Sequence, residues 1–391
     1  SLLFTPGPTL AKTLSIICGI LTIPAFRRAA AVLGMSAVTA SLATGVWALN
    51  VWLVRWSASG MESTLAVLLL LLAFEAQVRH RPAAGIWFGL AVLCRPEAAL
   101  MVVVSAVDLW RTCGWRKAAV AVGWAAVVIV PWQLFAGLTF GTLVPNTALV
   151  KTDAGLPSLS EFLLGLERTS MILISSEGIE IALIVSGVAA FFTSRYRISG
   201  RSQRWATLLF AWAAFPAAVY LSRGVYVQSR YLLIGMPPLT LGAFVLLEGL
   251  ARRGLVPRWT RLRFPLAGLI VLLQLALTWK VTLPHARAFE QTIAALTRLS
   301  AFLREATPPE AAVATGDVGV IGFYAHRYVL DLEGLISREV IPYRVGRPLD
   351  DLIIGETYWK VRRPDYIIAV SYTHLRAHET SLHLVCRLLL E

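Results

Sequence analysis

Long apolar segments recur through the first three quarters of this 391-residue chain and constrain its fold more than any other feature. An apolar run of about 18 residues or more is long enough to cross a lipid bilayer as a helix. A soluble protein of this length does not need a composition that is 57% hydrophobic. We therefore predict an α-helical polytopic membrane protein whose hydrophobic segments are Leu10–Phe26, Ala29–Leu53, Glu62–Val78, Ala83–Trp110, Ala118–Phe135, Glu177–Phe192, Trp205–Tyr220, Tyr231–Leu250 and Phe264–Leu283.

The formal charge of +13 is carried largely by arginines that form short clusters between the apolar segments. Cytoplasmic loops of membrane proteins are rich in Lys and Arg, so this distribution explains the charge without an acidic partner and argues against nucleic-acid binding. The arginine clusters are Arg27–Arg28, Arg79 with Arg81, Arg111 with Arg116 and Lys117, Arg195 to Arg204, and Arg252 to Arg263.

Cys18, Cys94 and Cys113 have no paired spacing, so no disulfide or zinc framework is predicted.

All the arginine clusters fall on one side of the membrane only if the segment Ala83–Trp110 enters the bilayer and returns. A single helix over this segment would be about 42 Å long, which exceeds the ~30 Å hydrocarbon core. Pro96 removes a helical hydrogen bond and disfavours helix at the residue before it. We therefore predict a broken hairpin with its turn at Arg95-Pro96-Glu97.

Polar residues gather on the side opposite the arginine clusters. A charge inside an apolar segment costs on the order of 2.5–3.5 kcal/mol on insertion scales, so such charges persist mainly where they pair or face a polar cavity. Glu62, Arg95 and Glu97 are therefore predicted to form the floor of one site. The remaining candidate substrate-binding residues on this side are Ser59, Asn146, Lys151, Arg223 and Arg230.

Each of the charged residues in this set also has a purely structural interpretation. Glu62 can cap its helix, since a carboxylate is stabilising at a helix N-terminus. Arg95 and Glu97 can form an ion pair that holds the helix break. The other three charged candidates can be solvated surface charges or side chains that reach the lipid headgroups: Lys151, Arg223 and Arg230.

The chain changes character after Leu283, where spanning segments give way to a small α/β pattern. We expect a transmembrane domain over residues 1–284 and an extracytoplasmic domain over residues 285–370. The second domain is predicted to contain a helix and three short strands: Arg287–Ala306, Ala311–Thr315, Tyr328–Leu332 and Tyr366–Val370. Residues 371–391 resemble a translated sequencing adapter from a metagenomic assembly, so they are left out of the fold prediction, and the chain is expected to be a fragment at both ends.

An outward-facing cavity with a buried Arg/Glu turn, an Asn-containing loop, a Lys and further arginines suits a bulky anionic lipid headgroup, because Arg and Lys can clamp a phosphate or diphosphate. Carboxylates there can bind sugar hydroxyls or position a divalent ion. The ordered set Ser59-Gly60-Met61-Glu62, Arg95-Pro96-Glu97 and Leu143 to Lys151, with Arg230-Tyr231 before Pro237-Pro238, resembles the polytopic GT-C glycosyltransferases over roughly Leu10–Val370. Within them it is most similar to the branch of mycobacterial terminal arabinofuranosyltransferases.

This resemblance implies an enzyme of the bacterial cytoplasmic membrane that inverts configuration while it transfers a sugar. The implied donor is a polyprenyl-phosphate sugar, and the implied acceptor is a glycan or lipid of the cell envelope. The family's catalytic base is an Asp in the first outer loop, which would precede Ser1, so this chain is expected to bind the donor without transferring its sugar. No metal site or cofactor is assigned to any residue, and a divalent cation is left open.

The alternative function is a transporter or flippase for a lipid-linked glycan. Transporters commonly carry internal repeats with a broken helix in each half. This sequence has one broken pair, at Arg95-Pro96-Glu97, and it has an outer domain that a flippase does not need. The sequence therefore favours the glycosyltransferase.

Overall fold

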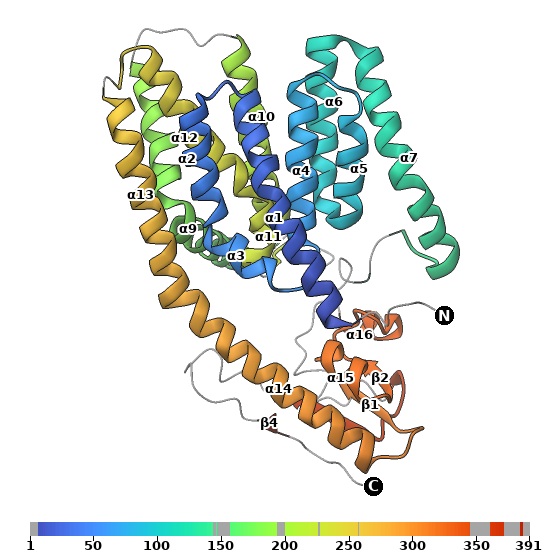
Figure 1. The fold of residues 1–391 in the computed structure, drawn as a ribbon. Helices are drawn as coiled ribbons and strands as arrows, with labels where there is room; N and C mark the ends of the chain where they lie inside the picture. The colour runs from blue at the N-terminus through green and yellow to red at the C-terminus, as the bar shows by residue number, and fades with distance from the viewer. Residues whose placement is uncertain are drawn as a thin grey trace. The chain divides into compact units, whose positions relative to one another are not determined.

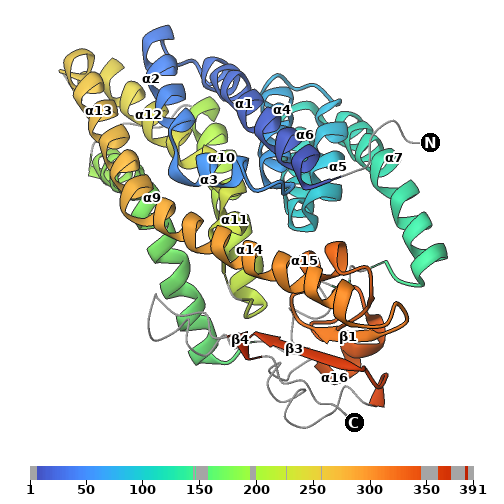
Figure 2. The same ribbon diagram turned by 60° about the horizontal axis from the view of Figure 1, so that its bottom comes forward.

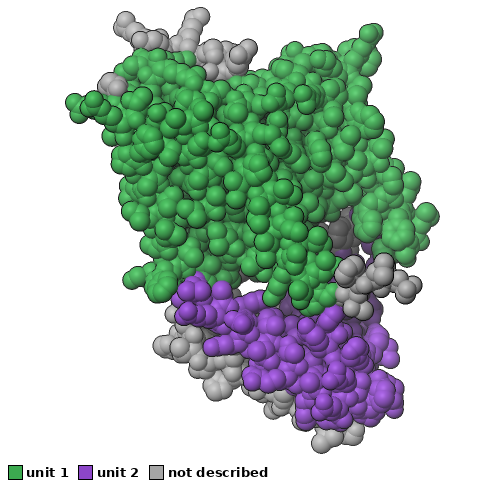
Figure 3. Space-filling model, in the orientation of Figure 1, with its two compact units in different colours: residues 1–141, 158–222, 226–282 green, residues 142–157, 223–225, 283–391 purple. Residues whose placement is uncertain are grey.

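The computed structural model describes residues 7–143, 146, 157–193, 200–225, 227–256, 258–344, 360–370 and 384–385. The chain divides into two compact units (Figure 3). The helical unit comprises residues 1–141, 158–222 and 226–282, and the C-terminal unit comprises residues 142–157, 223–225 and 283–391.

The helical unit is built from apolar helices, as predicted (Figure 1). Among the described residues, six helical stretches are long and apolar enough to span a membrane, and a bent pair of shorter helices would make a seventh. The helices of this unit are α1 Pro8–Val32, α2 Ala37–Ala48, α3 Val51–Ser57, α4 Ser63–Val78, α5 Ala84–Cys94, α6 Ala99–Cys113, α7 Trp115–Phe140, α9 Leu159–Thr193, α10 Gly200–Ser222, α11 Ser229–Leu232, α12 Pro237–Arg252 and α13 Trp259–Leu277.

The predicted broken hairpin is confirmed. Arg95 has an extended backbone that ends α5, and a single 3₁₀ turn, Pro96–Ala98, leads into α6. The end of α6 lies beside the start of α5, because Cys113 at the end of α6 contacts His80 just before α5. Figure 1 shows α5 and α6 side by side, with the turn at one end.

Two other predicted boundaries are wrong. The segment Ala29–Leu53 is not one span: α1 continues through Arg28 to Val32, and α2 and α3 meet at a bend of 54°. Asn50 makes this bend, because its side-chain oxygen accepts hydrogen bonds from the first two backbone amides of α3. The span predicted to begin at Glu177 begins at Leu159, and Glu177 instead marks a kink within α9.

Among the described residues, the arginines of these clusters gather at one end of the helices of the helical unit. Arg28 near the end of α1 binds Glu75 near the end of α4, at 2.9 Å. Arg204 of α10 binds Asp108 of α6 at 2.7 Å, and Arg252 at the end of α12 donates to the turn after α1. The turn at Arg95 lies at the other end, because α4 and α6 each run from that turn to the arginine-rich end.

Close packing of α5 against α7 depends on small residues. A Cβ atom at Gly85 would lie 1.9 Å from the backbone oxygen of Ala121, and one at Gly89 would lie 3.0 Å from that of Ala125. Two helix backbones can approach this closely only where no side chain separates them.

Gly85→Ala is therefore expected to destabilise the helical unit by about 1–3 kcal/mol, since an overpacked contact forces the backbones apart. Gly123→Ala in α7 is the control, because nothing lies within 4 Å of a Cβ at that position. Its stability should be unchanged or slightly higher, as alanine is the better helix former. Denaturant unfolding in detergent, followed by circular dichroism, measures both variants. Equal stabilities would contradict the packing described here.

The C-terminal unit is a small α/β domain (Figure 2). Its sheet has the order β2-β1-β3-β4, with β1 parallel to both β2 and β3 and with β4 antiparallel to β3. The three predicted strands and the predicted helix are confirmed to within a few residues. The elements are α14 Leu283–Ala306, β1 Ala312–Thr315, α15 Val318–Tyr324, β2 Tyr328–Asp331, α16 Ile341–Arg344, β3 Tyr366–Val370 and β4 Leu384–Val385.

The two faces of this sheet are buried separately. Val313 packs with residues of α14 and α15, whereas Ala314, its neighbour in β1, packs with Leu330 and Val340 on the opposite face. Successive residues of a strand point to opposite faces, so burial of both explains the uninterrupted apolar run in β1. Of residues 371–391, only β4 lies within the described part of the chain.

Candidate functional site

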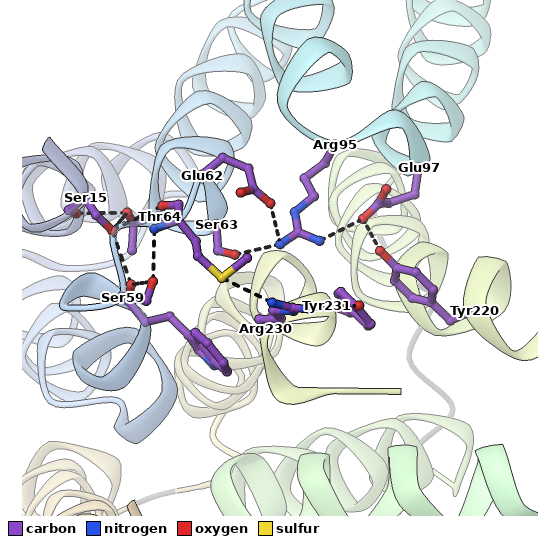
Figure 4. A network of polar contacts seen from close by, with 12 residues as sticks. Ser15, Ser59, Glu62, Ser63, Thr64, Arg95, Glu97, Tyr220, Arg230 and Tyr231 are labelled. Atoms are coloured by element: carbon purple, nitrogen blue, oxygen red, sulfur yellow. Dashed lines mark hydrogen bonds and ion pairs between the residues drawn. The ribbon is translucent and has the colours of Figure 1, made fainter. Parts of the chain in front are cut away.

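Arg95 is the centre of a polar network at the end of the helical unit that is remote from the arginine clusters (Figure 4). Its side chain is 7% exposed. Nη2 binds Glu62 Oε1 at 2.9 Å and donates to Ser63 Oγ at 2.7 Å, while Nη1 lies 3.7 Å from Glu97 Oε1. The break after α5 positions this guanidinium, because Pro96 forces Arg95 out of the helix and toward the start of α4.

Glu97 is held from two directions. Arg95 approaches it from one side, and Tyr220 near the end of α10 donates its hydroxyl to Glu97 Oε1 from the other. The Glu97 side chain is 8% exposed. Tyr220 also stacks on Tyr231 with ring centroids 4.7 Å apart. These contacts supply the partners that a buried carboxylate requires.

Arg230 is a second cation of the site, and it has a different environment. Its Nη2 donates to the hydroxyl of Tyr231 at 3.1 Å, and Nη1 lies 3.2 Å from the sulfur of Met61. No carboxylate among the described residues pairs with it, and its Nε is buried without a hydrogen-bond partner there. Arg230 and Arg95 both face the ring of Tyr231, with their Cζ atoms 5.0 and 5.5 Å from its centroid.

Ser59 shapes the turn that leads into α4. Its hydroxyl donates to the backbone oxygen of Trp56 at 2.6 Å and accepts from the amide of Met61 at 3.2 Å. Gly60 follows with φ of +75°, a conformation that glycine adopts readily. Ser15 of α1 contacts the backbone oxygens of Trp56 and Met61, each at 3.2 Å, and so fixes the turn against α1. Ser59 thus supports the position of Glu62 through the backbone.

The structure brings together five of the eight predicted substrate-binding residues: Ser59, Glu62, Arg95, Glu97 and Arg230. Asn146 and Arg223 belong to the C-terminal unit, where Asn146 donates to the backbone oxygen of Leu335 at 3.4 Å and Arg223 is exposed. Lys151 lies outside the described residues. The contribution of these three to the site stays a prediction.

The structural alternatives for Glu62 and Arg95 now have specific geometry. Glu62 occupies the N-cap position of α4, but its side chain makes no capping hydrogen bond and turns to Arg95 instead. Arg95 and Glu97 do pair across the helix break. Because the Glu62 side chain is 41% exposed, the network is partly accessible through this residue.

Sequence reasoning missed the tyrosine that completes this network. Tyr220 ends an apolar segment, where a tyrosine commonly marks the membrane interface, so nothing in its local sequence indicates a carboxylate partner. The sequence indicates Tyr231 only as the neighbour of Arg230, whereas the fold shows that its ring lies between two guanidinium groups.

The two carboxylates do not fit a divalent cation. Glu62 and Glu97 both bind Arg95, so an oxygen of each is already occupied and one of their two negative charges is offset by the guanidinium. In the described part of the chain, no three His, Cys, Asp or Glu side chains gather as metal ligands.

Comparisons with known proteins place this geometry in a fold class. Residues 285–386 match a family described as "Domain of unknown function (DUF8728)". Among solved structures, the chain is similar to ArnT from Cupriavidus metallidurans in the apo state, with a TM-score of 0.52 and 15% identity. The alignment covers 93% of this chain and 79% of ArnT. The comparison with curated protein sequences gives no match.

At this identity the similarity to ArnT concerns the fold alone. The chain therefore has an ArnT-like, mostly helical fold that includes helices long and apolar enough to cross a membrane, and it carries a small C-terminal α/β unit.

Proposed function

We propose that this protein is a membrane glycosyltransferase that takes a sugar from a polyprenyl-phosphate donor and transfers it to a glycan or lipid of the cell envelope. The GT-C-like fold supports the reaction class. One observation carries the choice of donor: Arg230, a cation with no acidic partner among the described residues, lies beside the buried Arg95. A phosphate is the ligand that such a cation favours, because guanidinium groups bind phosphate oxygens through paired, charge-assisted hydrogen bonds.

The two arginines have separate roles in this proposal. Arg95 is already neutralised by Glu62 and Glu97, so it acts as a fixed support that orients both carboxylates. Arg230 supplies the charge that attracts the donor phosphate. Glu62, the more exposed carboxylate, is placed to accept hydrogen bonds from sugar hydroxyls.

The sidedness of the membrane domain follows from its charges. Loops rich in Lys and Arg stay in the cytoplasm, and the arginine clusters of the helical unit gather at the end remote from Arg95. We therefore place the site on the outer side of a bacterial cytoplasmic membrane, with residues 285–370 also outside.

Sugar transfer with inversion requires a base within about 2.6–3.2 Å of the acceptor hydroxyl. Neither carboxylate of the network suits this role, since Glu62 binds Arg95 and Glu97 binds both Arg95 and Tyr220. We therefore assign the catalytic base to neither of them; the family resemblance implies an Asp of an outer loop for this role. Donor binding depends on Arg230 and does not require that base.

Arg230→Gln is expected to weaken donor binding by roughly 10-fold or more, as loss of a hydrogen bond to a charged group predicts. The measurement is equilibrium binding of a radiolabelled polyprenyl-phosphate pentose to the purified protein in detergent. Arg116→Gln is the control, because it removes an exposed positive charge from the arginine-rich end near Lys117. Equal binding by both variants would contradict the role given to Arg230.

A transfer assay with the same labelled donor distinguishes the proposed enzyme from a flippase. Proteoliposomes that contain a homologue with the same Arg95 network and an outer-loop Asp should transfer the pentose to an added glycan acceptor. Movement of the intact donor between leaflets, with no sugar transferred, would overturn the proposed reaction and support the transporter.

A further inference from the structure

A second polar site lies at the arginine-rich end of the helical unit. It is a cavity of about 620 Å³ lined by Val32, Val78, Arg79, His80, Thr112, Arg204 and Trp205. This cavity is far from Arg95, because α4 runs for 16 residues from Ser63 to Val78, or about 24 Å at 1.5 Å per residue. The two sites thus occupy opposite ends of the same helix.

Arg204 is fixed at one wall of this cavity. Its Nε and Nη2 donate to the two carboxylate oxygens of Asp108, each at 2.7 Å, and its guanidinium lies 4.6 Å from the ring centroid of Trp205. Gln77, which is 1% exposed, also donates to Asp108. Asp108 thus holds both Arg204 and Gln77 and organises the polar side of this cavity.

His80 connects Arg204 to α6. Arg204 Nη1 lies 3.0 Å from His80 Nε2 and can only donate, so Nε2 accepts and the ring proton resides on Nδ1. Nδ1 then donates to Cys113 Sγ at 3.0 Å. Burial and the Arg204 charge lower the pKa of His80, with Lys117 adding to the effect and Asp108 opposing it. The neutral ring therefore positions Arg204 and leaves the positive charge of the cavity to the arginines.

Arg79 is the cation of the cavity that the contacts among Arg204, Asp108 and His80 leave available to bind a ligand. Only its Nε is occupied, by Glu75 Oε1 at 3.2 Å, and Glu75 also receives Arg28. Its terminal Nη1 and Nη2 have no partner in the part of the chain that the structure describes, and its side chain is 45% exposed. The lining therefore combines free guanidinium donors and the Thr112 hydroxyl with the apolar surfaces of Val32 and Trp205.

We propose that this cavity binds the phosphate-bearing headgroup of an anionic phospholipid. A headgroup phosphate meets the free donors of Arg79, and the adjoining apolar side chains cover the start of the lipid chains. Basic pockets between membrane helices suit such headgroups, and the surrounding arginine clusters raise the local concentration of anions. This inference is independent of the proposed transferase activity, because the cavity shares no residue with the Arg95 network.

The test uses native mass spectrometry of the purified protein in detergent with phosphatidylglycerol, phosphatidylcholine or inorganic phosphate added. We expect phosphatidylglycerol to bind more tightly than phosphatidylcholine. Arg79→Gln should weaken phosphatidylglycerol binding by roughly 10-fold, as for a lost charge-assisted hydrogen bond. Arg81→Gln is the matched control: it removes an exposed arginine of the same turn that does not line the cavity, and binding should change less than about twofold.

Each outcome of this experiment decides the proposal. Equal losses in the Arg79 and Arg81 variants would overturn it and indicate general attraction to a basic surface. Equal binding of the two lipids would overturn it as well. Binding of inorganic phosphate that depends on Arg79, with no lipid preference for phosphatidylglycerol, would keep the phosphate site and reject the lipid as its source. Thermal unfolding of both variants shows whether each is folded, and neither should differ from the wild-type protein because both side chains are exposed.

Discussion

Arg95→Gln should destabilise the helical unit by about 3–5 kcal/mol, the cost of removing one partner from a buried ion pair. Glu97 is 8% exposed and would keep only the hydroxyl of Tyr220, while Ser63 Oγ would lose its donor. The variant should also lose donor binding, because Glu62 and the ring of Tyr231 lose the group that orients them. Denaturant unfolding in detergent measures the first effect, and equilibrium binding of the labelled donor measures the second.

Two further variants separate an unpaired buried charge from general damage. Glu62→Gln should cost less than about 1 kcal/mol, since its side chain is 41% exposed and exposed pairs contribute little. The double variant Arg95→Gln with Glu97→Gln should be more stable than Arg95→Gln alone, because it leaves no uncompensated buried carboxylate. If the double variant is the less stable of the two, Glu97 does not depend on Arg95 and the central pair of the site is wrong.

Asn50→Ala should lower the free energy of unfolding by roughly 2–4 kcal/mol, because two functions of one side chain are lost together. The Asn50 oxygen caps α3, and its amide nitrogen donates to Glu177 Oε1 at 2.5 Å. Glu177 is fully buried, and among the described residues the hydroxyl of Thr240, at 3.2 Å, would be its remaining side-chain donor. Denaturant unfolding in detergent gives the comparison.

Ser36→Ala supplies the matched control for Asn50. Ser36 caps α2 by accepting from the amide of Thr39, but it contacts no buried carboxylate of α9. Its replacement should cost only what a cap contributes, about 1 kcal/mol. An Asn50→Ala variant no less stable than Ser36→Ala would show that the contact with Glu177 contributes nothing.

The spanning helices and the broken hairpin could be predicted because their signals are local. Apolar length locates a span, and Pro96 within an apolar run predicts where α5 ends. The strands of the C-terminal unit were equally accessible, since short apolar runs such as Ala312–Thr315 are bounded by turn residues.

The bend at Asn50 could not be predicted, because its cause lies far away in the sequence. Apolar residues flank Asn50 on both sides, so the local pattern reads as one continuous span. Glu177, the partner that makes a buried asparagine favourable there, is 127 residues later. The same separation hid the kink of α9, which occurs where Glu177 turns inward to the α2–α3 bend.

The charged residues of the candidate site could be predicted from the sequence, whereas its neutral residues could not. A charge within an apolar run is conspicuous, so Arg95 and Glu97 could be selected from the sequence alone. Tyr220 reaches Glu97 from 123 residues away and has no local signature. The distinction between the paired Arg95 and the unpaired Arg230 likewise depends on which carboxylates the fold brings near each of them.

The proposed function requires that a lipid-linked sugar phosphate binds at the Arg95 network. A polyprenyl-phosphate pentose with a diazirine on its first isoprene unit tests this directly, with the labelled peptides of the purified protein identified by mass spectrometry. We predict labelling of peptides that contain residues 59–63, 95–97 or 229–231, reduced by unlabelled donor and by Arg230→Gln. Labelling that unlabelled donor does not reduce, or that falls mainly on the peptides of Arg79 and Arg204 at the opposite end, would contradict this assignment.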